Sequence, residues 1–103
     1  MSGSSDPVKP VGGDQSVRVR PAGLAWRQAG HEVVVLDLAA LSYHALNASG
    51  ALLWERLAGW TTAGELTGTL VSSFGLAPAA AAADVGRFLD ECAGAGLLET
   101  REP

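Results

Sequence analysis

The sequence predicts one α+β domain in which a small antiparallel sheet is followed by three short helices. Two observations carry this prediction. The 103 residues are one domain's worth of chain, and 48% hydrophobic with 17% charged residues is a balance that can form a packed core. The apolar pattern also changes at Asn47 from a period of about two to a period of about 3.6, which separates a strand-forming half from a helical half.

Short apolar runs in the first half predict the strands. Residues 1–15 are rich in glycine, proline and serine and are expected to form a flexible tail, which leaves residues 16–100 for the domain. The alternating segment 17–20 is compatible with a short edge strand or an extended arm. Three further candidates, residues 24–28, 33–36 and 41–46, are expected to form an antiparallel meander.

Start and stop residues define the three helices. Asn47 is a good N-cap for a helix over residues 48–58, with Gly59 positioned to end it. Thr62 and Glu65 have capping-box spacing, so a second helix is expected from there to Gly75. The third helix begins near Pro78, and Gly94 and Gly96 close it. Apolar stripes are expected from Leu66, Leu70, Val71 and Phe74, and from Ala81, Val85, Phe88, Leu89 and Cys92, with Leu97 and Leu98 packing as an apolar tail end.

Composition and charge exclude several classes of function. Residues 1–61 carry five acids and five bases, so the net charge of -4 lies entirely after Thr61. No apolar run approaches the roughly 20 residues that span a bilayer, and the N-terminus lacks a signal-peptide pattern, so we expect a cytoplasmic protein with no membrane partner. Cys92 is the only cysteine, and no phosphate loop, paired carboxylates or metal-ligand cluster is present. We therefore expect no metal, no cofactor and no catalytic residue.

The segment 41–46 is the most informative feature of the predicted sheet. It contains neither a proline nor a charged residue, the features with which proteins usually protect an exposed sheet edge. An unprotected edge beside helices is suited to accept an added strand from a partner peptide.

Six segments of the chain have a characteristic order and spacing: 33–38, 43–47, 51–57, 83–85, 88–89 and 95–98. The most specific parts are the Leu46-Asn47 step and Trp54, which follows that asparagine by seven residues. Taken together, these segments resemble the PqqD-like family, also called precursor-peptide recognition elements. The resemblance covers about residues 24–99 and is closest to the stand-alone member encoded in lasso-peptide clusters.

The resemblance implies a winged-helix-like fold and a non-catalytic adaptor. In this family the leader of a ribosomally made precursor peptide pairs as an extra antiparallel strand against the third strand, in the groove beside the third helix. The adaptor, a monomer or weak dimer, then delivers the leader to a partner leader peptidase or other modifying enzyme. Carried over to this chain, the leader-binding residues are Leu41, Ser42, Tyr43, His44, Ala45 and Leu46 on the strand and Asp84, Arg87, Phe88 and Glu91 on the helix. The chain departs from the family pattern at Leu41-Ser42, where a glycine and a basic residue are common.

Alternative interpretations remain open for the whole chain and for single residues. A winged-helix DNA-binding regulator is the chief rival, but the third helix carries Asp84, Asp90 and Glu91 against Arg87 and would repel phosphates. A structural subunit of a larger enzyme would share the adaptor's surface. Cys92 paired with a histidine would be a nucleophile, whereas its place on an apolar stripe indicates inert packing. His44, Tyr43 and Phe88 are either peptide contacts or ordinary strand and core residues, Trp54 is expected in the core, and Trp60 is expected to be partly exposed.

Overall fold

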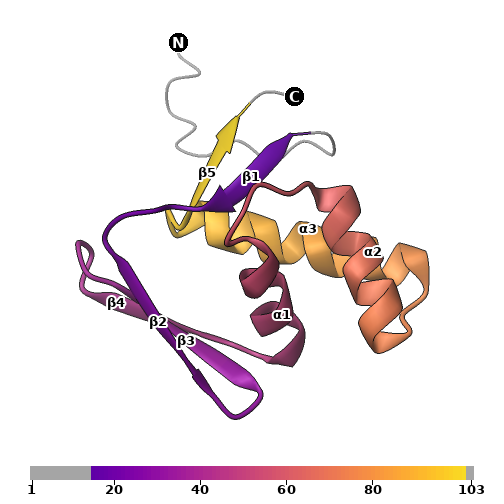
Figure 1. The fold of residues 1–103 in the computed structure, drawn as a ribbon, viewed down its shortest axis with the longest axis horizontal. Coiled ribbons are helices and arrows are strands. Elements are labelled where there is room, and N and C mark those ends of the chain that lie inside the picture. The colour runs from indigo at the N-terminus through magenta and orange to yellow at the C-terminus, as the bar shows by residue number, and fades with distance from the viewer. Residues whose placement is uncertain (1–14, 102–103) are drawn as a thin grey trace.

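A computed structural model describes residues 15–101, and all but the last residue of the predicted N-terminal tail lies outside this range (Figure 1). The described chain has five strands and three helices, in an α+β arrangement that confirms the predicted class. Their order is β1 (Ser16–Val19), β2 (Leu24–Ala29), β3 (Glu32–Asp37), β4 (Ser42–Leu46), α1 (Ala48–Arg56), α2 (Ala63–Phe74), α3 (Pro78–Gly94) and β5 (Leu98–Arg101).

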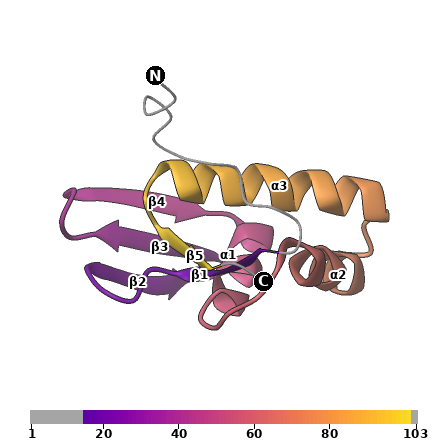
Figure 2. The ribbon, with the colours of Figure 1, turned by 90° about the horizontal axis from the view of Figure 1, so that it is seen from above.

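The predicted meander is present as an antiparallel sheet with the strand order β2-β3-β4. Gly30 turns the chain between β2 and β3 with φ of +66°, a conformation that glycine adopts without steric cost. On β3 every second residue faces the helices, so Val33, Val35 and Asp37 are buried while Leu36 is not. The sheet therefore has one covered and one open face, as Figure 2 shows from above.

The helix boundaries follow the predicted caps closely. Asn47 accepts a hydrogen bond from the amide of Gly50 and begins α1, while Thr62 and Glu65 form the expected capping box of α2. Gly75 ends α2 in the left-handed conformation, and Pro78 stands in the first turn of α3. Only α1 differs, because it ends at Arg56, before Ala58 and the predicted stop at Gly59.

The core lies between β3, the three helices and β1. Trp54 is 2% exposed and is the largest side chain in it, as predicted, and Leu53 and Leu57 of the same region are equally buried. The expected stripe of α2 is only partly correct: Leu66 and Leu70 are buried, but Phe74 is 45% exposed. Phe74 lies in the last turn of its helix.

A second, two-stranded sheet joins the two ends of the described chain. β1 pairs antiparallel with β5, from Ser16 opposite Arg101 to Val19 opposite Leu98. The strand alternative for residues 17–20 is thus confirmed. Leu97 is buried and Leu98 packs against the core, as expected, but Leu98 also begins a strand that the sequence did not predict. The half-buried Trp60 ring lies between two guanidinium groups, with its centroid 4.5 Å from Cζ of Arg18 and 4.2 Å from Cζ of Arg101.

Candidate functional site

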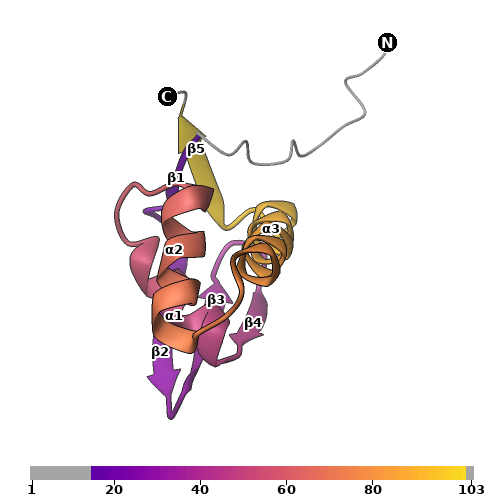
Figure 3. The ribbon, with the colours of Figure 1, turned by 90° about the vertical axis from the view of Figure 1, so that its right-hand side faces the viewer.

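β4 is the edge strand of the sheet that lies next to α3 (Figures 2 and 3). Within residues 15–101 no strand pairs with its outer edge. The register shows which backbone groups that edge offers. The amide of Leu38 donates to the carbonyl of Gly23 at 2.9 Å, so Gly23 and Leu38 form a hydrogen-bonded pair. Hydrogen-bonded and non-hydrogen-bonded pairs alternate in an antiparallel ladder, so every second pair between β2 and β3 is hydrogen-bonded in the same way.

Alternation then fixes the hydrogen bonds of β4. Val33, Val35 and Asp37 direct their backbone groups to β4, where their register partners are Leu46, His44 and Ser42. The two residues between these partners, Tyr43 and Ala45, direct their amide and carbonyl groups away from the sheet. The open edge therefore presents two residues with free hydrogen-bonding groups to an incoming strand.

The side chains of β4 divide between the two faces of the sheet. Ser42, His44 and Leu46 stand opposite residues of the buried face and are half-buried on the helix side. Tyr43 and Ala45 point to the open face, where Tyr43 is 71% exposed. Tyr43 is thus turned away from α3, so any contact with a peptide would be made on the open face of the sheet. On the helix side, His44 lies between Ser42 and Leu46 along β4, with its Nε2 3.5 Å from Oγ of Ser42.

Leu41 belongs to the turn before β4 and not to the strand. Its φ is +54°, the left-handed region that glycine favours, and its side chain is 89% exposed. The PqqD-like family, which the sequence resembles, commonly has glycine at this position. The chain thus keeps the turn conformation without the residue that suits it best.

Asp37, which was not among the predicted site residues, organises this turn. Its buried carboxylate accepts hydrogen bonds from the amides of Ala39 and Ala40, both at 3.1 Å, and an ion pair from Arg20 at 3.2 Å. The Ala40 amide and the Arg20 guanidinium hold the pKa of the Asp37 carboxyl below its ordinary value, against the opposing effect of burial. Aspartate side chains often accept hydrogen bonds from backbone amides two residues further on in a turn. The place of Asp37 shortly before the Ala39-Ala40 link was therefore a sequence signal for this role.

The four predicted residues of α3 are brought together at the end of the β4 strand. Asp84, Arg87, Phe88 and Glu91 line a small cavity of about 90 Å³ with the first turn of α1, which contributes Asn47, Ser49 and Gly50. Phe88 is half-buried, and Asp84 and Arg87 form an ion pair of 2.7 Å between Oδ1 and Nη2. Arg87 is therefore already partnered, and an acidic group of a ligand would have to compete with Asp84.

Gly50 makes the junction between β4, α1 and α3 possible. A β-carbon at this position would lie 3.2 Å from Oδ1 of Asn47 and 3.3 Å from Cε1 of Phe88, closer than side chains normally pack, and would touch Cβ of Leu46 at 3.4 Å. The glycine thus allows Phe88 to lie against the end of β4, which places an aromatic ring beside the open edge.

The alternative chemical roles find no support among the described residues. Cys92 is 4% exposed, and burial with the nearby Glu91 carboxylate raises the pKa of its thiol to about 12, so the reactive thiolate is not formed near neutral pH. Within residues 15–101 no cluster of three histidine, cysteine or acidic side chains could hold a metal ion. The same part of the chain contains no helix long and apolar enough to cross a membrane.

Comparisons with known proteins agree with this geometry. The family model described as coenzyme PQQ synthesis protein D (PqqD) matches residues 32–98, which include β3, β4 and all three helices. No curated protein matches the chain.

Three solved structures share the fold. The structure of TbiB1 in complex with the TbiA(beta) leader peptide is 24% identical, with a TM-score of 0.72 over 80% of this chain and 94% of that one. Lasso peptide synthetase B1 complexed with its leader peptide is also 24% identical, with a TM-score of 0.69 over 81% and 96%. The PqqD truncation of Methylobacterium extorquens PqqCD, a stand-alone recognition element for ribosomally synthesised and post-translationally modified peptides, is 21% identical, with a TM-score of 0.70 over 86% and 94%. At these identities the likeness establishes the fold, and the family match establishes that this chain belongs to the PqqD family.

Proposed function

We propose that this chain is a non-catalytic adaptor that binds the leader of a ribosomally synthesised precursor peptide as an added strand on β4 and delivers it to a partner leader peptidase or other modifying enzyme. The observation that carries the proposal is the open edge of β4, where Tyr43 and Ala45 direct backbone groups away from the sheet beside α3. Two of the solved structures with this fold are complexes with leader peptides, and one of them is a lasso peptide synthetase B1, which favours lasso-peptide biosynthesis as the pathway.

The proposed contacts follow from the placement of the residues. The backbone of residues 42–46 gives affinity that does not depend on the peptide sequence, because the paired groups are main-chain atoms. Specificity comes from side chains on the two faces: His44, Leu46 and Phe88 on the helix side, and Tyr43 on the open face. Leu41, Asp84, Arg87 and Glu91 form the polar and turn-side margin of the site. The buried thiol of Cys92 supports an adaptor that performs no chemistry itself.

A residue-resolved titration tests this proposal. The neighbouring genes serve only to choose the peptide probes. Synthetic peptides corresponding to the N-terminal halves of short reading frames beside the gene are titrated into ¹⁵N-labelled protein. We expect the amides of Tyr43 and Ala45 to shift and to gain protection from hydrogen exchange, while the amide of His44, already bonded to β3, keeps its protection.

Two outcomes would contradict the proposal. One is that none of these peptides binds. The other is that a peptide binds but protects amides elsewhere, for example on α3 or on the β1-β5 sheet, while Tyr43 and Ala45 continue to exchange as in the free protein. Titration with duplex DNA at low and high salt serves as the comparison for the nucleic-acid alternative, which predicts salt-dependent binding.

A further inference from the structure

The sheet has a second open edge, on β2, and its exposed apolar residues have no role in leader binding on β4. β2 (Leu24–Ala29) is the edge strand opposite β4 in the strand order, and within residues 15–101 no strand pairs with its outer edge. Five of its six residues are exposed, among them Trp26, which is 49% exposed. The strand contains no proline, and its single charged residue is Arg27, so it carries little of the usual protection against edge-to-edge association.

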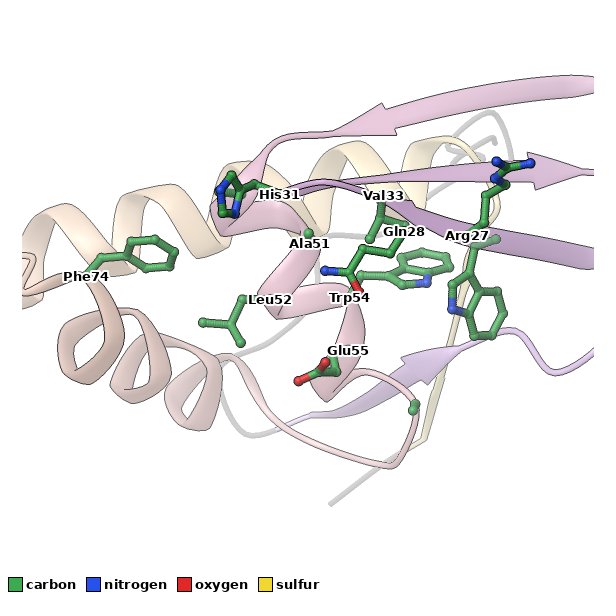
Figure 4. Close-up of a pocket in the computed structure, with 12 residues that line it drawn as sticks. Arg27, Gln28, His31, Val33, Ala51, Leu52, Trp54, Glu55 and Phe74 are labelled. Atoms are coloured by element: carbon green, nitrogen blue, oxygen red, sulfur yellow. The ribbon is translucent and has the colours of Figure 1, made fainter.

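A cavity of about 620 Å³ opens beside this strand, and Figure 4 shows it between α1, the end of α2 and the β2-β3 hairpin. Its apolar wall is formed by Trp26, Leu52, Trp54 and the exposed Phe74. The Trp26 ring packs on the edge of the Trp54 ring, with centroids 5.5 Å apart. An open edge and an apolar hollow therefore lie side by side, a combination that suits an added strand whose side chains enter the hollow.

We infer that this edge pairs with the β2 strand of a second copy of the chain, in an antiparallel arrangement with Trp26 on the two-fold axis. Two requirements limit the possible registers. Paired residues must lie on the same face of the sheet, and the pairs that exchange hydrogen bonds must be residues whose backbone groups point outward. From the β2-β3 ladder these outward residues are Leu24, Trp26 and Gln28.

Two symmetric registers centred near the middle of the strand satisfy both requirements, and the side chains that they set opposite each other decide between them. A centre at Trp26 pairs Trp26 with itself and Leu24 with Gln28 of the second copy, all outward-pointing residues. A centre at Arg27 would also pair outward-pointing residues, but it would place two guanidinium groups opposite each other, which is unfavourable. The Trp26 register instead sets each Arg27 opposite Ala25.

The charge distribution favours this face over the rest of the molecule. The net charge of -4 lies after Thr61, so association through α3 would bring like charges together. Residues 1–61, which contain β2, are neutral overall. A six-residue strand with one tryptophan per copy forms a small interface, below the roughly 1,200 Å² that stable complexes bury, so the dimer is weak and concentration-dependent. Both β4 edges remain open in it, and each dimer can hold two leaders.

Disulfide trapping between two single variants tests the register. In the Trp26-centred dimer Ala25 faces Arg27 of the second copy in a non-hydrogen-bonded pair, with Cα atoms about 4.5 Å apart, which a disulfide can bridge. We expect Ala25→Cys and Arg27→Cys, mixed and oxidised, to form a covalent dimer that contains one chain of each. Each variant alone has no cysteine opposite it, so each is the other's control. The native Cys92 is buried and does not compete.

Sedimentation velocity over a range of protein concentrations gives an independent measurement on the unmodified chain. We expect a reversible monomer-dimer equilibrium, and we expect Trp26→Lys to shift it at least tenfold towards monomer. Three results would each overturn the inference. The mixture could cross-link no more than the separate variants, one variant could cross-link equally well with itself, or the unmodified chain could stay monomeric at every concentration. Leader titration of the same variants is read at β4, so a failure of this inference is distinct from a failure of the proposed leader site.

Discussion

Ala45→Pro is the substitution that tests strand addition most directly. The amide of Ala45 points away from the sheet, so the native fold does not use it as a donor, but an added strand would. Proline removes this donor and leaves one carbonyl of the bound peptide without a partner. At a partly solvated edge this costs about 1–2 kcal/mol, which corresponds to a roughly 5-fold to 30-fold weaker leader affinity.

The assay is isothermal titration of the leader into the wild-type chain and the variant. Gln28→Pro is the matched control, because Gln28 also directs its amide outward, but on the β2 edge. It should leave leader affinity unchanged and weaken self-association. Thermal unfolding of both variants should stay close to wild type, since neither amide is bonded within the sheet.

His44→Pro distinguishes a lost leader contact from a damaged sheet. The amide of His44 is directed to β3, so proline there should destabilise the fold itself. Equal leader affinity for wild type and Ala45→Pro, with both proteins folded, would refute the reasoning about this edge. Equal weakening by Ala45→Pro and Gln28→Pro would show instead that proline acts through general loss of sheet structure.

Four further predictions concern single residues around the site. Gly50→Ala should lower the free energy of unfolding by about 1–3 kcal/mol and weaken leader binding, because the added methyl group must displace Phe88 or the capping side chain of Asn47; denaturant titration checks it, and an unchanged midpoint would contradict the packing argument. Leu41→Gly should raise the free energy of unfolding by about 1 kcal/mol by relieving the left-handed conformation, whereas the control Leu41→Ala should not. The lowered pKa of Asp37 contributes stability that is present above its ordinary pKa and lost as the pH falls through its folded value; Asp37→Asn should therefore flatten the stability profile below about pH 4, and parallel profiles would exclude this role. Cys92→Ala should cost about 1–2 kcal/mol of stability and leave leader affinity and precursor processing intact, and a loss of processing in a folded, leader-binding variant would reveal a chemical role for the thiol.

The local elements could be predicted from the sequence because their causes are local. Asn47, the Thr62 and Glu65 box and Gly75 act on the backbone within a turn of their own position, and the structure confirms all of them. The β-branched run of residues 33–36 likewise indicated a strand from its own residues, and it lies within β3.

What could not be predicted depends on distant partners. The strand character of Leu98–Arg101 exists only because β1 lies beside it, and nothing in that short segment indicates a partner near the N-terminus. The direction of the Tyr43 side chain depends on the register of β4 against β3, in which a shift of one residue would exchange the two faces. The bond between Arg87 and Asp84 was not foreseen, although their spacing on one helix permits it.

The pairing of β1 with β5 has a consequence for how the chain folds. Arg18 and Glu99, which form an ion pair across these strands, are 81 residues apart, so the ribbon can close only after the segment between them is compact enough to bring its ends together. The hairpins and helices in between involve short chain separations and can form earlier. Trp60, held between Arg18 and Arg101, lies where this last closure occurs. Its fluorescence should therefore change in a slower kinetic phase than the helical circular dichroism signal during refolding.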